Sequence, residues 1–293
     1  MSGSSVSDIR DRLQSLAPGI VAAFSFAIAD VLGKIVFIAG ADVLTLATFR
    51  GVVSLVFMAL WLRVAPPPVP HTPRACWVAL GMGLLLAGIV FGIFKAIQIV
   101  DVPIAILTYF VYPLFTGLLA AVFGLERLGW RGAFAALVAF LGLALTVGAH
   151  QGELALAGLA FAIGAACCRT AVLLITRAAL YDSDARLTTW YSIVSSTVVF
   201  VAASVLTWTW NAPQTTIGWI ALIGVTITTT IAVLALFIST NRIGPFRSAL
   251  IMNLEPLLVT ILSAPLLGEV ITPIQAFGSA IMLAALVAFQ SRR

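Results

Sequence analysis

Six charged residues stand inside long apolar stretches of this sequence, where a charge needs a partner or a polar cavity. They are Asp30, Lys34, Arg50, Lys95, Arg169 and Glu255. A charged side chain at bilayer depth costs about 2.5–3.5 kcal/mol on insertion scales, so such residues mark cavities or buried pairs. A cation among them could bind a carboxylate, and a carboxylate could bind an ammonium group. With apolar walls, such a set suits an amino acid or an organic anion.

The six charges differ in how readily a role other than substrate binding explains them. Lys34 and Lys95 stand near the ends of their apolar stretches and could extend to the bilayer surface. Asp30 precedes Lys34 by one helical turn, a spacing at which the two charges could simply neutralise each other. The three deeper charges are Arg50, Arg169 and Glu255. For these three we expect a role in a cavity or a gate, with a structural ion pair or an arginine bound to backbone carbonyls as the alternative.

Helical spacing places other side chains beside these charges. In one predicted helix Tyr109 and Tyr112 share a face, and in a second Glu255 shares a face with Ser248. In a third predicted helix, Phe237 shares a face with threonines. Those threonines could either contribute to a site or only hydrogen-bond to carbonyls of their own helix. The candidate residues for substrate binding or gating are therefore Arg50, Lys95, Tyr109, Tyr112, Glu255, Arg169 and Phe237.

Two prolines interrupt these same helices. Pro113 and Pro256 each precede a glutamate, Glu126 and Glu269, by the same spacing. A proline inside a helix removes a backbone donor and frees a carbonyl group. In membrane carriers, matched interruptions point to the site and its hinge, so we predict a hinge at Pro113 and Pro256. A passive kink is the alternative.

The step in sequence number from Pro113 to Pro256, which we call the repeat offset, recurs elsewhere in the chain. It joins further identical pairs without a gap: Gly81 and Gly224, Phe94 and Phe237, Leu107 and Leu250, Ala121 and Ala264. Matches arise by chance in an apolar chain, but an unbroken register does not. The chain is therefore predicted to contain two copies of one unit.

Composition identifies the class of protein. The mean hydropathy is +1.13, and 61% of the residues are hydrophobic while 9% are charged, against about 25% charged in soluble domains. These values predict an integral membrane protein that interacts with the lipid bilayer. The net charge is +5, but the basic residues stand singly between apolar runs, as at an anionic membrane surface. No nucleic-acid partner is predicted.

Ten apolar runs have the length of a membrane-spanning helix. They lie near 17–38, 42–63, 75–99, 103–123, 130–149, 154–177, 187–209, 217–240, 246–267 and 273–290. Continuous apolar runs exclude the alternating pattern of a membrane barrel. We predict an all-α membrane protein with a polar cytoplasmic tail at 1–16, a first five-helix repeat at 17–149 and a second at 150–293.

The basic residues predict how the helices are oriented. Twelve of them fall at one side of a ten-helix trace, and the connections on the other side hold none. Because positive loops stay in the cytoplasm, both termini are predicted to be cytoplasmic. Five helices per repeat is an odd number, so the second copy enters the membrane from the opposite side. The repeats are therefore predicted to be inverted, as in secondary transporters.

At this point the residues resemble a known family. The 5+5 plan, the Leu254-Glu255-Pro256 segment, Gly268-Glu269, and the first-half counterparts Pro113 and Glu126 are similar to the EamA family of the drug/metabolite transporter superfamily. Within the superfamily, the pattern looks closest to a bacterial exporter of aromatic amino acids. The resemblance implies a secondary transporter in the bacterial inner membrane that exports small hydrophobic or aromatic amino acids, or related metabolites, by alternating access.

Other functions receive less support. The two histidines, His71 and His150, accompany no metal-binding, nucleophile or nucleotide motif, so no enzyme, metal or cofactor is predicted. Cys76, Cys167 and Cys168 lie inside apolar runs and predict no disulfide. A carrier of organic anions or drugs is the main alternative, because cations outnumber carboxylates among the buried charges. A channel is less favoured, since paired interruptions in inverted repeats suit alternating access.

Overall fold

Helices joined by short connections make up the part of the chain that the structure describes. The computed structural model describes residues 3–67, 70–100, 102–125 and 156–267, with isolated positions between 129 and 145 and between 273 and 284. Its helices are α1 (Gly3–Ile38), α2 (Val43–Val64), α3 (Pro73–Ile99), α4 (Val102–Tyr109), α5 (Tyr112–Val122), α7 (Leu156–Ala179), α8 (Ala185–Thr207), α9 (Thr216–Ile243), α10 (Pro245–Met252) and α11 (Leu254–Leu267).

Within those residues, seven helical segments are long and apolar enough to cross a membrane. Six are single helices, and the seventh, Pro245–Ser263, runs through α10 into α11. Large apolar side chains remain exposed on their outer faces, among them Leu206 at 81% and Val122 at 69%. Exposed apolar surface of this extent is unfavourable in water and favourable in lipid, so this is a multi-pass membrane protein. The predicted fifth and tenth helices, at 130–149 and 273–290, lie largely outside the described residues, as do Glu126 and Glu269.

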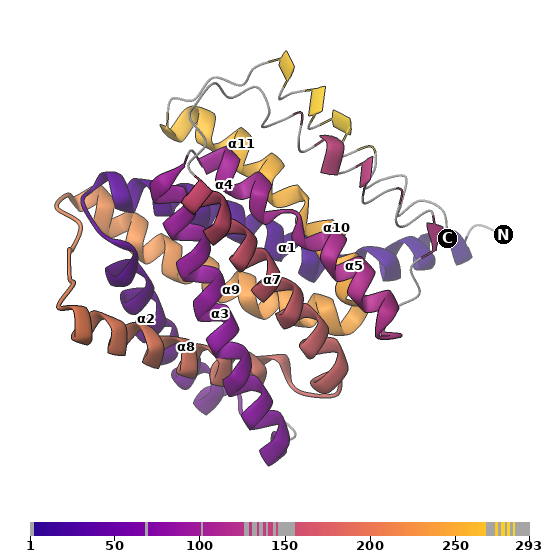
Figure 1. Ribbon diagram of the computed structural model, residues 1–293. Coiled ribbons are helices and arrows are strands. Elements are labelled where there is room, and N and C mark those ends of the chain that lie inside the picture. Colours follow the sequence, from indigo (N-terminus) through magenta and orange to yellow (C-terminus); the bar gives the residue numbers. More distant parts are fainter. Residues whose placement is uncertain are drawn as a thin grey trace.

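Three boundaries differ from the sequence prediction. The predicted tail at 1–16 continues as helix, because α1 begins at Gly3. The predicted run 103–123 is two helices, α4 and α5, separated at Phe110 and Val111 (Figure 1). The run 246–267 is likewise split at Asn253 into α10 and α11. Each break stands within three residues before a proline, which cannot donate a backbone hydrogen bond to the carbonyl four residues earlier, that of Tyr109 or Met252.

The ends of the helices repeat at the register that the sequence showed. The repeat offset carries both ends of α4 onto the ends of α10, and it carries the start of α3 onto the start of α9. It also carries the end of α2 onto the end of α8. The two interruptions, at Phe110 and Asn253, are related by the same offset. The duplicated sequence therefore folds into duplicated elements.

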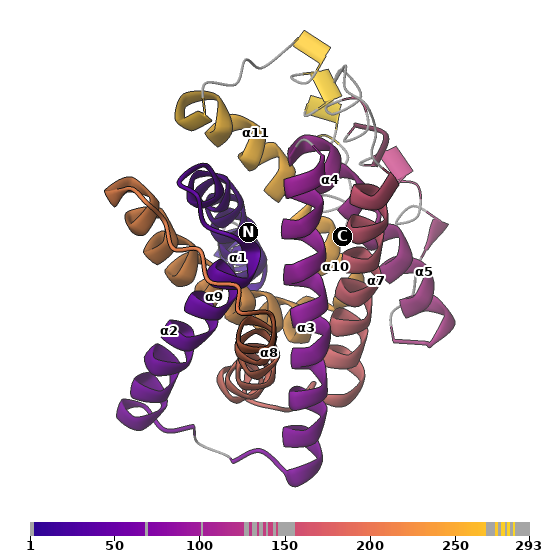
Figure 2. The ribbon, with the colours of Figure 1, turned by 60° about the vertical axis from the view of Figure 1, so that its left-hand side comes forward.

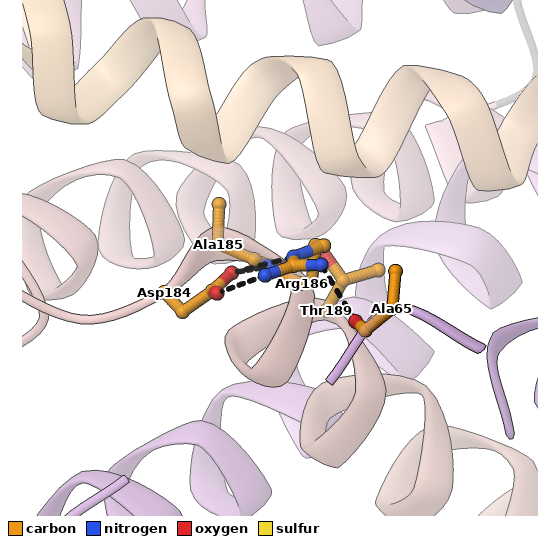
Figure 3. Close-up of polar contacts among 5 residues, drawn as sticks. All are labelled: Ala65, Asp184, Ala185, Arg186 and Thr189. Carbon is orange, nitrogen blue, oxygen red and sulfur yellow. Dashed lines mark hydrogen bonds and ion pairs between the residues drawn. The ribbon is translucent and has the colours of Figure 1, made fainter. Parts of the chain in front are cut away.

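Contacts at the helix ends show that the two units run in opposite directions. At the start of α2, Oδ2 of Asp42 accepts a hydrogen bond of 3.0 Å from the backbone of Asn211, between α8 and α9. After the end of α2, the carbonyl of Ala65 accepts one of 2.9 Å from Nη1 of Arg186, at the start of α8 (Figure 3). The α1–α2 and α7–α8 connections therefore lie at opposite ends of the bundle, as inverted repeats require.

Helices of each half pack against helices of the other half. α1 packs along α9, and the matching pair, α7 and α3, lie side by side in both views (Figures 1 and 2). Gly92 permits the second contact, because a Cβ there would lie 2.8 Å from the carbonyl oxygen of Phe161. α2 and α8, which also match, pack on each other where Gly51 faces Thr197. The core is therefore an interface between the repeats and not two separate cores.

Candidate functional site

Two arginines line one cavity between the halves. Arg50 of α2 and Arg169 of α7 face it, and its other walls come from α1, α3, α8 and α9. The cavity encloses about 40 Å³, room for a few water molecules. Among the described residues that line it, none is acidic. The cavity is therefore cationic and, in this conformation, too small for a solute the size of an amino acid.

The lining residues come in matched pairs from the two repeats. Pairs related by the repeat offset are Phe26 and Arg169, Arg50 and Ile193, Leu86 and Thr229, and Val90 and Val233. Residues related in this way face each other across the axis that relates inverted repeats. The cavity is therefore centred on that axis, where two units that move against each other would open and close it.

Arg169 is held by aromatic side chains. Its side chain is 5% exposed, and its Nε donates a hydrogen bond to the hydroxyl of Tyr109. The guanidinium carbon lies 4.8 Å from the ring centroid of Phe26, 5.7 Å from that of Tyr109 and 6.0 Å from that of Tyr112. A cation over desolvated rings is stabilised by their quadrupoles. These contacts hold a buried cation at the cavity wall without an ion pair among the described residues.

The break between α4 and α5 is tied to α7 beside that arginine. Thr170 donates to the carbonyl of Tyr112 over 3.3 Å, and Thr116 donates to Thr170 over the same distance. The rings of Tyr109 and Tyr112 lie 5.2 Å apart. These side-chain contacts join the first turns of α5 to α7. A movement at this break would therefore move Tyr109 and, through it, Arg169.

Arg50 differs from Arg169 in having no partner. No hydrogen bond or ion pair joins it to another residue in the described part of the chain, and its electrostatic neighbour is the like-charged Arg169. Two guanidinium groups at one cavity repel each other. An anion between them would relieve that repulsion and use the free donors of Arg50.

Hydroxyl groups supply the remaining polarity of the cavity. The hydroxyls of Ser54 on α2 and Thr230 on α9 bond over 2.6 Å, which joins the two halves. Thr230 and Thr229 also donate to carbonyls of their own helix, the back-bonding that the sequence left open. Ser196 donates to the carbonyl of Ile193 over 3.1 Å. These hydroxyls keep oxygen lone pairs available to a donor group of a bound solute.

Asp30 and Glu255 interact with each other behind Arg169. Their side chains are 8% and 3% exposed, they lie where α1 packs on α11, and their carboxyl groups contact each other. No ion pair joins Asp30 to Lys34, its neighbour one helical turn along, among the described contacts. Instead Arg169 acts on both carboxyl groups from α7, without coming within ion-pair distance.

Each end of the bundle carries a closure between the halves, and the two closures differ in chemistry. At one end, which we call the Asp42 closure, Asp42 caps α2 and accepts the backbone amide of Asn211. At the other, the Asp184 closure, Asp184 caps α8 and pairs with Arg186 at 2.8 Å, and Arg186 also reaches Ala65 (Figure 3).

Two groups in the Asp184 closure have shifted pKa values. Partial burial by itself raises the pKa of the Asp184 carboxyl, but the hydrogen bonds and charge of Arg186 outweigh it, so this pKa lies below its usual value. Partial burial lowers the pKa of His71, and the charge of Asp184 opposes that shift. His71 bonds to Thr188 over 3.3 Å and stacks on Tyr191.

The structure brings together most, but not all, of the candidates taken from the sequence. One connected group consists of Arg50, Arg169, Tyr109, Tyr112 and Glu255. Lys95 lies apart from it and donates to Gln98 over 3.3 Å. Phe237 is buried in the core, 1% exposed, and does not line the cavity. Pro113 and Pro256 stand at the two helix breaks.

Sequence reasoning missed several lining residues, among them Phe26, Ser54, Ser196 and Phe200. Apolar and small hydroxyl residues carry no signal of their own in an apolar chain. One signal was available for Phe26, since it is the repeat counterpart of Arg169.

Comparisons with known proteins agree with the architecture. The sequence pattern of the EamA-like transporter family matches twice, over residues 15–148 and 156–289. A solved structure described only as "Crystal structure of protein" is 17% identical, with a TM-score of 0.72 over 92% of this chain and 97% of its own. At that identity the likeness establishes a shared fold. A search of curated proteins found no match.

Proposed function

The chain belongs to the EamA-like transporter family, and on that premise we propose that it exports small hydrophobic or aromatic amino acids, or related carboxylates, across the bacterial inner membrane by alternating access. Membership of this family implies a membrane transporter with a small-molecule substrate. The class of substrate and the direction are our proposal. It includes ten membrane-spanning helices with both termini in the cytoplasm.

The observation that carries the proposal is the pair of guanidinium groups at the cavity between the repeats. The substrate carboxylate would bind Arg50, whose donors are free, and Arg169 from the opposite half. Its side chain would lie against the aromatic and aliphatic walls, which include Phe26 and Phe200. An ammonium group would bind the hydroxyls of Ser54, Ser196 or Thr230, because Glu255 does not line the cavity in this conformation.

Transport would require the repeats to move apart, since about 40 Å³ does not admit an amino acid. The breaks at Phe110 and Asn253 are the places where the helices next to the cavity can bend, with Pro113 and Pro256 as hinges. Opening one closure while the other stays shut would expose the cavity to one side at a time.

A set of ligands with one ring tests the substrate class. Purified protein in lipid vesicles would be loaded with phenylalanine, with 3-phenylpropionate, which lacks the ammonium group, or with phenethylamine, which lacks the carboxylate. We expect saturable efflux of phenylalanine, and none of phenethylamine, because two arginines repel a bare cation. Arg50→Gln should slow the efflux by about tenfold at low phenylalanine concentration, since it removes a charge-assisted hydrogen bond, while Lys95→Gln, outside the group, should retain it. Efflux of phenethylamine alone would contradict the proposal.

Transport of organic anions is the second candidate, and the absence of an acidic residue among the described lining residues favours it. It predicts that 3-phenylpropionate moves faster than phenylalanine in the same vesicles. A channel would show flux that keeps rising with concentration and does not saturate.

Cysteine labelling tests the topology. A cysteine at position 3 and one at position 292 should both react only from the cytoplasmic side. Labelling of either from outside would contradict the proposed ten-helix topology.

A further inference from the structure

The carboxyl groups of Asp30 and Glu255 form a second polar site, next to the cavity but not part of it. Both side chains are more than nine-tenths buried. Oδ2 of Asp30 and Oε2 of Glu255 have no hydrogen-bond partner among the described residues. The two carboxyl groups contact each other across the α1–α11 interface. A buried acidic pair with unused oxygens needs a positive or hydrogen-bond-donating ligand.

Charge limits what that ligand is. Two carboxylates in contact and out of water repel each other strongly, and the usual solution is that they share one proton. Arg169 acts on the pair but makes no ion pair with either residue in the described structure. One proton on the pair removes the repulsion and supplies the hydrogen-bond donor that two carboxylates lack.

The groups around the pair connect it to the cavity. Arg169 of α7, Tyr109 of α4 and Tyr112 of α5 interact electrostatically with it, and Arg169 also acts on Arg50 of α2. The charged residues of α9 and α10, Arg242 and Arg247, stand at the junction of those helices. Tyr109 interacts with both carboxyl groups and accepts a hydrogen bond from Arg169. Arg169 itself lines the cavity.

We propose that Asp30 and Glu255 form a proton-binding site, linked through Tyr109 and Arg169 to the binding of a carboxylate in the cavity. The link rests on the proposed function. When the pair gives up its proton, its second negative charge attracts Arg169 away from the cavity. When the pair holds the proton, Arg169 is available to the substrate carboxylate. Proton and carboxylate therefore strengthen each other's binding.

The proton enters from the water on the side to which the carrier is open and leaves on the other side, and no covalent bond of the substrate changes. Because proton and carboxylate occupy the carrier together, they cross the membrane in the same direction. An inward proton gradient would then oppose the proposed export, which would proceed only when the outward gradient of the carboxylate exceeds it. Proton coupling thus determines the direction of net transport when a proton gradient is present.

Infrared spectroscopy tests the proton site without any substrate. Purified wild-type protein at neutral pH should show the C=O stretching band of a protonated carboxyl group. The band should disappear in Glu255→Gln and in Asp30→Asn, and remain in Asp182→Asn, which changes an exposed acid in the α7–α8 connection. A wild-type spectrum without the band, or a band that survives in both amide variants, overturns the proton site whether or not the protein transports amino acids.

Binding as a function of pH tests the link. The affinity of the full-length protein for 3-phenylpropionate should fall as the pH rises, by up to about tenfold per pH unit, the limit for one linked proton. Glu255→Gln should bind with an affinity that does not change with pH, and Asp30→Asn serves the same purpose if the first variant does not fold. A wild-type affinity that is constant with pH, or no binding at all, overturns the link and leaves the infrared result to decide the site.

Discussion

Arg169 of the second repeat and Phe26 of the first occupy matched positions and lie against each other, 4.8 Å from guanidinium carbon to ring centroid. Two other matched pairs that line the cavity also differ, Arg50 with Ile193 and Thr229 with Leu86, while Val90 and Val233 are identical. In contrast, the bounds of the matched helices follow the repeat offset almost throughout. The comparison teaches that the two repeats kept the backbone and diverged in the side chains at their shared axis.

Physical chemistry explains why the divergence falls there. A residue on the axis of a symmetric pair lies next to its own copy, so two arginines at positions 26 and 169 would meet without a counter-charge. Replacing one by an aromatic ring turns repulsion into a cation–π contact. At the break, Tyr112 and Glu255 differ in the same way. One repeat therefore supplies the rings and the other the buried charges at these two matched positions.

The strongest way to break this comparison is to remove the buried cation. Arg169→Gln should lower carboxylate affinity by roughly 10- to 150-fold, which corresponds to about 1.5–3 kcal/mol for hydrogen bonds to a charged group. Ligand binding in detergent would measure it. Lys95→Gln, which changes a cation on α3 outside the cavity, should alter affinity less than about twofold. Equal losses in the two variants would remove the special position of Arg169.

A charge exchange sharpens the comparison. Arg50→Ile should weaken carboxylate binding by about tenfold, since it removes a charge-assisted hydrogen bond. Adding Ile193→Arg places the cation at the matched position in the other repeat. If the cavity lies on the axis, the double variant should recover most of the lost affinity. Ile193→Arg that fails to restore binding in a folded double variant would show that the two positions are not equivalent.

The helix breaks offer a test of a feature that both repeats kept. Proline in a helix interior costs about 3 kcal/mol, so alanine at either position favours a continuous helix. We expect Pro113→Ala and Pro256→Ala each to slow transport by roughly two- to fivefold, with little change in ligand affinity, because hinges govern the rate of rearrangement. Vesicle efflux and equilibrium binding would separate the two quantities. A large loss in only one repeat would mean that the hinges do not work as a pair.

The smallest predicted effect concerns the two closures. Asp42→Asn should change little, because asparagine caps a helix as well as aspartate. Asp184→Asn should loosen the Asp184 closure by about twofold, since an ion pair at a partly exposed site contributes about 0.2–1 kcal/mol. Amide hydrogen exchange, corrected for intrinsic rates, would compare the two ends through the peptides around the starts of α8 and α2.

The same exchange measurement should depend on pH at one end alone. The pKa of His71 is depressed in the folded protein, so the stabilisation it gives is present above the unfolded value of about 6.5 and is lost as the pH falls through the folded pKa. For Asp184, whose pKa is also depressed, the loss occurs only below about pH 4. The Asp184 closure should therefore loosen between about pH 7 and 5, while the Asp42 closure does not. Equal loosening at both ends would contradict this assignment.

Sequence reasoning reached the fold more readily than the site. A chain with long apolar runs has few ways to satisfy its backbone in lipid, so hydropathy predicts helices. The repeat offset predicted the matched breaks, because proline acts on its own helix and needs no distant partner. Asp30 shows the limit. Its spacing from Lys34 suggested a local pair, while the structure gives it Glu255, which lies in the other repeat.

By itself, the sequence determined the membrane class, the duplication and the positions of the breaks, since these follow from composition and from local backbone chemistry. Only the tertiary structure decided which buried charges share a site. Arg50 and Arg169 reach one cavity because α1 packs on α9 and α3 on α7 across the axis, and the same exchange leaves Lys95 and Phe237 outside it. The physical reason is that the partners of a charge in a low-dielectric interior are the groups that tertiary packing places near it. Those groups lie on other helices.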